Sequence, residues 1–197
     1  MNIALKTYLI EKAGLTEDEF KKLEVGIKYK SISKGNFLLR EGEVCEATFF
    51  VETGVLRSFS IDESGKEHII QFAPENWFIS DRGSVYFNEV SEIFIDAVED
   101  TKVAIIDSEF LTKASKISSA FRAYNDKLLH NHIRHLQKRL NLLLSATSEK
   151  RYLNFINLYP DLTLRVPQWM IASYLGITPE SLSRVRKELA TKNFKKE

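Results

Sequence analysis

Apolar residues in the first thirty positions recur at roughly helical spacing, which predicts helices there. A start signal supports one of them. Thr16 is a good N-cap residue, and Glu17, Asp18 and Glu19 follow it at the positive end of the expected helix. The recurring apolar positions are Leu5, Leu9, Leu15, Phe20, Leu23 and Ile27.

From residue 32 to residue 106 the pattern changes to short runs of β-branched and aromatic residues, separated by glycines and other turn residues. Such a series of short strands predicts an antiparallel sandwich or barrel. The sequence from Asp62 to Gly65 lies between two runs and is typical of a hairpin turn. The predicted strands span residues 37–39, 48–51, 55–61, 68–72, 93–98 and 103–106.

Residues 108–146 return to a helical pattern, and their second half carries a seam of apolar residues. The steps of the seam alternate between four and three, and charged residues flank it, as in the dimerisation seam of a coiled coil. An amphipathic helix packed on its own domain is the alternative, because the seam covers only about two heptads. The seam residues are Leu129, Ile133, Leu136, Leu140 and Leu143.

The last part of the chain predicts three short helices, which span residues 149–158, 168–175 and 179–191. Between the second and third, Gly176 permits a turn that most residues adopt only with strain. Ile177 is expected to fill the corner between the helices, while Thr178 and Pro179 suit the N-cap and first position of the third. This arrangement predicts a helix-turn-helix, whose second helix can enter the major groove of DNA.

The two faces of the third predicted helix differ in chemistry. Leu182, Val185 and Leu189 repeat at steps of three and four and form an inner face. Any helical hairpin shares one or two of these features, whereas their combination is specific to DNA binding. The opposite face presents polar and charged side chains: Glu180, Ser181, Ser183, Arg184 and Lys187.

The chain has 197 residues and a net charge of +1, but the charge is unevenly divided. Residues 1–118 carry 14 Lys and Arg against 21 Asp and Glu. Residues 119–148 carry 5 against 1, and residues 149–197 carry 9 against 5. A basic second part suits a polyanionic partner, although chance alone can divide charge in this way.

Cysteine usage and hydropathy narrow the class of protein. The single Cys45 excludes a disulfide framework, a thiolate zinc site and a four-cysteine iron–sulfur cluster, and it suits a reducing compartment. Residues 1–15 lack the apolar run of a signal peptide, and no apolar run reaches the length of a membrane span. We therefore expect a cytoplasmic protein that has no membrane partner.

The segment from Ile171 to Arg184 resembles the helix-turn-helix of the Crp/Fnr family of bacterial transcription regulators. Glu41-Gly42-Glu43 and the segment from Phe49 to Arg57 resemble the cyclic-nucleotide-binding jelly roll of that family. The resemblance implies an α+β fold in three parts and, because few residues follow the last helix, a short or missing wing. The parts are an antiparallel jelly-roll sensor over residues 1–118, a dimerisation helix over 119–146 and a helix-turn-helix domain over 149–197.

The resemblance also implies roles in DNA binding. Gln168 would approach the phosphate backbone, while Glu180 and Arg184 would read bases, since Glu accepts from cytosine and Arg binds guanine bidentately. For Glu180 and Arg184 the alternatives are a helix-dipole residue and a solvated surface charge. Pro179 stands where the family often has Arg, so one base position would be read differently. Further candidates for DNA contacts are Thr178, Ser181, Ser183 and Lys187.

The implied partners are a pseudo-palindromic operator in double-stranded DNA, a second copy of the chain, and RNA polymerase. No cofactor is assigned, beyond an unidentified small-molecule effector in the jelly roll.

The resemblance weakens at the sensor pocket. Cyclic-AMP-binding members have a Gly-Glu pair and a later Arg-Ser/Thr-Ala triplet, where this chain has Ser80-Asp81 and Ser91-Glu92-Ile93. Asp81 can accept a ribose hydrogen bond, but no Arg meets the cyclic phosphate, and an inward Glu92 would repel it. We therefore expect that the effector is not cyclic AMP. Two alternatives stay open: a regulator that needs no ligand, and a cyclic-nucleotide-responsive one that uses Asp81 and Arg82.

Other sensors and an enzyme have less support in the sequence. His132 and His135 are three apart and could share a helix face that holds haem or a metal, but such pairs are usually plain surface residues. A cupin-like metal enzyme needs several ligands in the strand region, which offers only His68, so we expect no enzymatic activity. One aromatic set could line an apolar pocket or simply belong to the core: Trp77, Phe78, Tyr86, Phe87 and Phe94.

Overall fold

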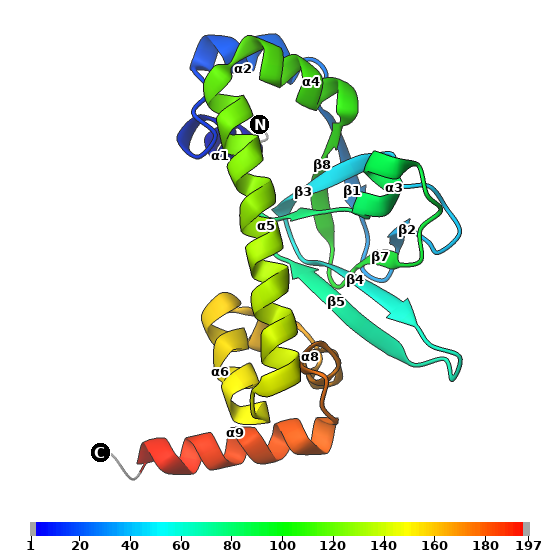
Figure 1. The fold of residues 1–197 in the computed structure, drawn as a ribbon, viewed down its shortest axis with the longest axis vertical. Coiled ribbons are helices and arrows are strands. Elements are labelled where there is room, and N and C mark those ends of the chain that lie inside the picture. The colour runs from blue at the N-terminus through cyan, green and yellow to red at the C-terminus, as the bar shows by residue number, and fades with distance from the viewer. Residues whose placement is uncertain (1–2, 195–197) are drawn as a thin grey trace. The chain divides into compact units, whose positions relative to one another are not determined.

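The computed structural model describes the backbone of residues 3–194 and the side chains of residues 4–192 (Figure 1). The chain divides into two compact units. The first comprises the described residues up to Lys66 together with Ile70–Asn131, and the second comprises Glu67–Ile69 together with the described residues from His132 onward. Within residues 3–194, no helix is long and apolar enough to cross a bilayer.

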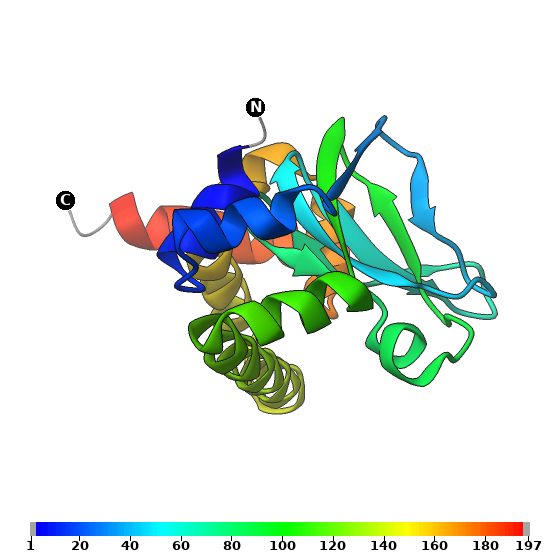
Figure 2. The same ribbon diagram turned by 90° about the horizontal axis from the view of Figure 1, so that it is seen from above.

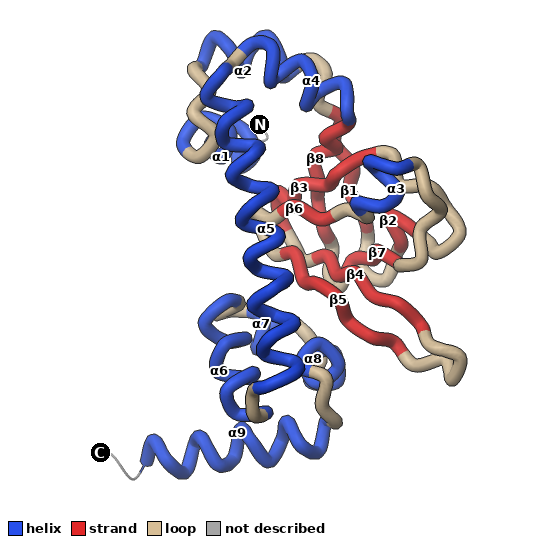
Figure 3. Tube along the Cα trace, viewed as in Figure 1, coloured by secondary structure: helices blue, strands red, loops and turns tan. Residues whose placement is uncertain are grey.

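Two four-stranded sheets lie at the centre of the first unit, in the part of the chain that the structure describes (Figure 3). Their strand orders are β1-β8-β3-β6 and β2-β7-β4-β5, and the neighbouring strands run antiparallel, which confirms the predicted sandwich. The strands are β1 (Lys28–Ile32), β2 (Phe37–Leu39), β3 (Ala47–Thr53), β4 (Leu56–Ile61), β5 (Glu67–Ala73), β6 (Phe78–Ile79), β7 (Phe94–Ala97) and β8 (Thr101–Asp107).

All six predicted strands are present, and the structure adds β1 and β6. Strand β1 corrects the prediction of helix over residues 1–30, because helical structure ends at Glu24. Ile27 continues the helical spacing of the apolar residues, but it lies beyond the end of the helix that stops at Glu24. Its side chain is nevertheless buried with those of the N-terminal helices. Beyond this turn the backbone pairs with β8, from Lys28 opposite Ile105 to Ile32 opposite Thr101.

The side chains of β3 show how one sheet separates two apolar cores. Phe49 and Val51 point into the cluster between the sheets, whereas Phe50 points into a second cluster with the buried faces of the helices. At Thr16 the predicted N-cap is confirmed as a capping box with Glu19. The helices that contribute to the second cluster include α1 (Ile3–Glu11), α2 (Glu17–Glu24) and α4 (Ser108–Ile117), which Figure 2 shows from above.

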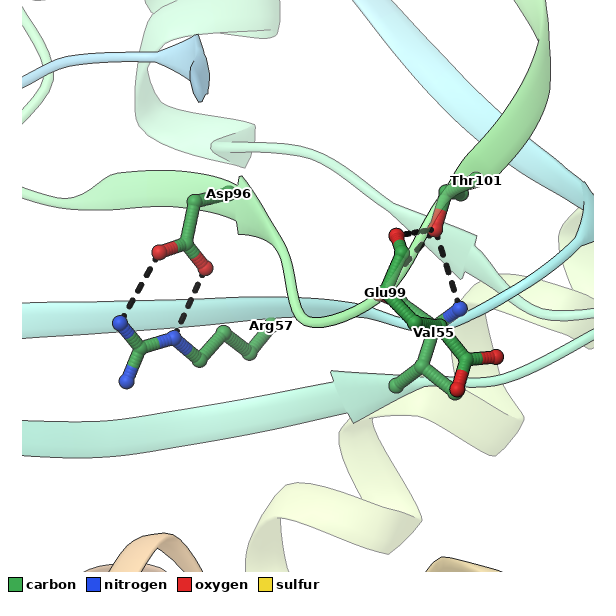
Figure 4. Close-up of polar contacts among 5 residues, drawn as sticks. All are labelled: Val55, Arg57, Asp96, Glu99 and Thr101. Atoms are coloured by element: carbon green, nitrogen blue, oxygen red, sulfur yellow. Dashed lines mark hydrogen bonds and ion pairs between the residues drawn. The ribbon is translucent and has the colours of Figure 1, made fainter. Parts of the chain in front are cut away.

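An ion pair lies buried on neighbouring strands of the second sheet (Figure 4). Arg57 on β4 and Asp96 on β7 face each other in register and form two parallel hydrogen bonds, Nε to Oδ1 at 2.7 Å and Nη2 to Oδ2 at 2.9 Å. The Arg57 guanidinium also lies 4.2 Å from the ring centroid of Phe59. Bidentate geometry of this kind offsets the loss of hydration that burial causes.

Gly54, between β3 and β4, is required by its surroundings. Its φ is +92°, and a Cβ added there would lie 2.6 Å from the carbonyl oxygen of Asp100 and still nearer the Thr101 hydroxyl. That hydroxyl accepts a hydrogen bond from the Val55 N–H and donates to the Glu99 carbonyl (Figure 4). A side chain at Gly54 would therefore break the hydrogen bonds by which Thr101, at the start of β8, is joined to Val55, just before β4.

Helices make up most of the second unit. The predicted helical region from residue 108 is divided at Ser118, whose extended backbone ends α4 before α5 begins. The three short helices predicted after it are confirmed, and α7 is an addition. The helices are α5 (Ser119–Ser145), which is shared with the first unit, α6 (Ser148–Leu158), α7 (Leu162–Arg165), α8 (Gln168–Leu175) and α9 (Pro179–Phe194).

The second unit has an aromatic core and includes the first three residues of β5. Phe155, Tyr159 and Tyr174 pack with ring centroids 5.3–5.9 Å apart. Ser173 Oγ donates to the Glu67 carbonyl and accepts from the Ile69 N–H, at 2.9 and 3.0 Å. These bonds join the side of α8 that carries Ser173 to the first residues of β5.

Candidate nucleic-acid interface and effector pocket

The turn between α8 and α9 has the geometry that the sequence predicts. Gly176 closes α8 in the left-handed conformation, with φ of +64°, and its N–H donates to the carbonyls of Ala172 and Ser173. Thr178 Oγ1 then accepts from the Ser181 N–H at 3.3 Å, as expected of the N-cap of α9. These local signals set the point at which the chain changes direction between the two helices.

One face of α9 is buried and the other is open. Leu182 and Val185 are buried against the rest of the unit, and Leu189 is half-buried. Ser181 is half-buried beside Thr178, its hydroxyl 3.3 Å from Thr178 Oγ1. The remaining predicted DNA contacts on this helix are exposed, namely Glu180, Ser183, Arg184 and Lys187.

Charged groups on the open face are available to a partner. Within the described part of the chain, the side chains of Arg184 and Lys187 form no hydrogen bond or ion pair. Hydrogen bonds with its own backbone N–H and with the Thr178 side chain lower the pKa of Glu180, so this carboxylate stays ionised and can accept hydrogen bonds. The exposed face thus carries one acidic acceptor at its start and cationic donors further along the helix.

Gln168 at the start of α8 lies beside α9. Together with Pro179, Ser183 and Arg186 it lines a hollow of about 320 Å³. The structure therefore brings the predicted contacts Gln168 and Ser183 together. Arg186 is a member of this group that the sequence analysis missed, although its spacing from Pro179 and Ser183 places it on the same flank of the helix.

The predicted dimerisation seam lies on α5 and is open along its length. Its side chains are between 38% and 57% exposed, which is unusual for five apolar residues on one helix face. The neighbouring Leu144 is also exposed, as are all five predicted seam residues: Leu129, Ile133, Leu136, Leu140 and Leu143.

Two of the four predicted effector-pocket residues bind each other. Asp81 is the N-cap of α3 (Arg82–Phe87), and its Oδ1 accepts from the backbone N–H groups of Gly83 and Ser84. Its Oδ2 accepts from the hydroxyl of the buried Ser91 at 2.7 Å. The carboxylate thus occupies the N-terminus of α3 and is linked to the strand side of the site.

The other two predicted pocket residues point elsewhere. Arg82 stacks on Tyr86, with its guanidinium carbon 4.7 Å from the ring centroid, and Tyr86 is itself 51% exposed. Glu92 is exposed, so its carboxylate does not enter the site. Among these four residues, the cation Arg82 stacks on Tyr86, while the candidate ribose acceptor Asp81 is bonded to Ser91.

The aromatic residues considered as a pocket lining lie in different surroundings. Trp77 packs beside the core between the sheets, Phe78 beside the helical core, and Phe94 stacks on Phe59. Tyr86 and Phe87 are exposed. The core interpretation therefore holds for three of them and neither interpretation for the other two.

Comparison with known proteins gives consistent matches over both units. Residues 29–117 match the cyclic nucleotide-binding domain. The transcriptional activator protein Anr of Pseudomonas aeruginosa is 28% identical over 184 residues, which cover 87% of this chain and 75% of the relative. FnrA of Stutzerimonas stutzeri, also named a transcriptional activator, is 28% identical over 79% of this chain and 68% of its own length.

Solved structures show the same fold. FixK2 from Bradyrhizobium japonicum has a TM-score of 0.72 and 24% identity, covering 85% of this chain and 86% of its own. A transcriptional regulator of the Crp/Fnr family from Eubacterium rectale has a TM-score of 0.64 and 19% identity, covering 91% and 85%. The matched relatives are named transcriptional activators, and the fold of this chain is that of solved Crp/Fnr regulators.

Three further observations bear on the remaining expectations. Among the residues that the structure describes, no group of three or more His, Cys, Asp or Glu is placed to hold a metal ion. Partial burial and the neighbouring Arg134 and Lys138 lower the pKa of His135. Helix α9 continues to Phe194, in the region where a wing would follow a shorter helix. Residues 195–197 lie outside the described part of the chain.

Proposed function

We propose that this chain is a Crp/Fnr regulator that binds a pseudo-palindromic DNA operator as a homodimer, through the α8–α9 helix-turn-helix of each subunit. The observation that carries the proposal is the open face of α9, on which Arg184 and Lys187 have no partner among the described side chains. A helix that is buried on one side and polar on the other is the form that enters a major groove.

Each side chain on this face has a chemically distinct role. Arg184 donates bidentately to guanine, and the ionised Glu180 accepts from the amino group of cytosine. Gln168 contacts the phosphate backbone at the start of α8. Thr178, Ser181, Ser183 and Lys187 supply further contacts with phosphates and bases.

The exposed seam of α5 supports the homodimer. Burying five apolar side chains against a second copy removes them from water, which is the main favourable contribution to such an interface. A parallel pairing also brings two recognition helices to the spacing of successive major grooves, about 34 Å. Transcription control through RNA polymerase, in the cytoplasm and without catalysis, completes the proposal.

The effector of the jelly roll is proposed to be a compound other than cyclic AMP. The N-terminus of α3 already holds the Asp81 carboxylate, and Ser91 stands where cyclic-AMP-binding members have Arg. A hydrogen bond to a charged group contributes about 1.5–3 kcal/mol. Its loss weakens binding by roughly one to two decades.

A regulator that needs no ligand is the second candidate, and the same internal pairing of Asp81 with Ser91 favours it. Native mass spectrometry of the purified protein distinguishes the two. A retained small molecule supports an effector. Protein that carries no small molecule but binds its operator with full affinity supports the ligand-free regulator.

Selection from a random duplex library tests DNA recognition. We expect enrichment of two inverted half-sites, with centres about 10–10.5 base pairs apart or a multiple of that spacing. Failure to enrich any sequence, or enrichment of a single unpaired half-site, would contradict the proposal.

Calorimetric titration tests the effector assignment. We expect no binding of cyclic AMP at micromolar concentrations and no change in operator affinity when it is added. A dissociation constant in the low micromolar range, together with tighter operator binding, would make Arg82 the first residue to examine as the phosphate partner.

A further inference from the structure

The flank of α9 beside Gln168 differs from its open face. Pro179, Ser183 and Arg186 follow one another at steps of four and three, so they line one side of the helix. Arg184 and Lys187 project from the neighbouring side, which faces away from the buried residues Leu182 and Val185. A helix lying in a major groove presents its outer face to bases and its flanks to the groove walls, which are formed by phosphates.

The hollow on this flank is lined by one cationic residue and by neutral residues. The lining residues are Gln168, Pro179, Ser183 and Arg186, around a volume of about 320 Å³. None of the four lining residues carries a negative charge. In the described part of the chain, the Arg186 side chain makes no ion pair or hydrogen bond, and it is exposed.

We infer that this hollow is a phosphate-binding site in which Arg186, with Gln168 and Ser183, holds one DNA backbone phosphate in each half-site. The inference rests on the proposed function and adds a residue that the sequence analysis did not assign. An arginine fork matches two phosphate oxygens, so it fixes the register of the protein on the duplex. Such a contact carries no base information, unlike that of Arg184.

The test compares the salt dependence of DNA binding for the parent, Arg186→Gln and Lys192→Gln. Fluorescence anisotropy is measured on the selected operator and on a scrambled duplex of the same length. Lys192→Gln is the matched control, because it removes one positive charge from the same helix at a side chain that already pairs with Glu149 at 2.9 Å. Circular dichroism melting confirms that each variant is folded.

We expect Arg186→Gln to make the slope of log affinity against log salt shallower by about 1.8 for the dimer, at about 0.9 for each phosphate contact. The loss of affinity should be equal on the operator and the scrambled duplex. Lys192→Gln should retain the slope of the parent. Arg186→Lys, which keeps the charge but not the fork, should retain most of the slope while binding more weakly than the parent.

An unchanged slope for Arg186→Gln would overturn the inference, and so would a loss confined to one base position of the operator. The proposed function fails separately, if the parent itself does not distinguish the operator from the scrambled duplex.

Discussion

Polar side chains are used in opposite ways at the sensor site and on helix α9. At the sensor site, the Asp81 carboxylate accepts from two backbone N–H groups and from Ser91, while Ser84 Oγ accepts from the Cys45 N–H. On α9, Arg184 and Lys187 make no comparable bond in the described part of the chain. The Asp81 carboxylate is paired within the protein, whereas the cationic side chains of α9 are presented to solvent.

This difference indicates where a ligand can gain free energy. A group that is already hydrogen-bonded in the folded protein must lose a partner before it gains one, so the exchange yields little. A solvated cation on a convex helix face loses only water and gains a phosphate or a base, with release of counterions. Substitutions in the first region should therefore change the free energy of unfolding, and those in the second should change binding.

The largest effect is expected on the α5 seam. Replacing Leu136 and Leu140 together with Glu would place carboxylates in the interface, so monomers should form and operator affinity should fall about 10²–10⁴-fold through lost bivalency. Light scattering and anisotropy measure the two results. Leu144→Glu is the control, because Leu144 lies on the same helix outside the seam and is 79% exposed. A double variant that remains dimeric would place the interface elsewhere.

The second effect concerns the buried ion pair of the first unit. Asp96→Ala leaves the Arg57 guanidinium buried without its carboxylate, which should lower the free energy of unfolding by about 3–5 kcal/mol. Urea unfolding measures it. Glu92→Ala, at an exposed carboxylate nearby, should change stability by less than about 0.5 kcal/mol.

A third variant checks whether charge or packing causes that loss. Replacing the pair by Arg57→Met with Asp96→Leu should recover most of the stability, since no unpaired charge remains. If the single and double variants were equally unstable, packing rather than ion pairing would be responsible.

On α9 we expect substitutions to change DNA binding and to leave stability unchanged. Arg184→Ala should leave the unfolding transition unchanged and cost about 1–3 kcal/mol of specific binding, with relaxed choice at one base position of each half-site. Binding to a set of singly substituted operators measures the preference. A variant that discriminates among them as the parent does would show that Arg184 does not read a base.

The smallest effect is expected from the pH response of Glu180. A carboxylate with a lowered pKa remains ionised as the pH falls, and it protonates only below that lowered value. Base preference at its position should therefore persist between about pH 7.5 and pH 5.5, because the ordinary pKa of Glu is about 4.3. NMR titration of Thr178→Val should show a higher Glu180 pKa than in the parent, since this substitution removes a hydrogen bond to the carboxylate. An equal pKa would exclude the Thr178 hydroxyl as a cause.

Much of the second unit could be predicted because its signals are local. Gly176, Thr178 and Pro179 act within one turn of the chain, and they set the end of α8 and the start of α9. The strands were also found from local runs, whereas β1 was missed because its apolar residues continued a helical spacing. Its pairing with β8 joins residues that are 69 to 77 positions apart in the chain.

The candidate sites were less predictable for the same reason. The pairing of Arg57 with Asp96 spans 39 residues, and that of Asp81 with Ser91 depends on where α3 begins. The sequence alone does not show in which direction any of these four side chains points. Arg186 was missed because its importance comes from Gln168, which lies on a different helix.

The bond between Asp81 and Ser91 has a consequence for anions in general. The Asp81 carboxylate, which is part of the chain, already occupies the position at the N-terminus of α3 that an added anion would take. An attached group has an effective concentration in the millimolar range or above. An anion at micromolar concentration would therefore have to bind the N-terminus of α3 far more tightly than a carboxylate does in order to displace it. For the effector site proposed above, this pairing would favour effectors that leave Asp81 in place over anions that compete for the N-terminus of α3.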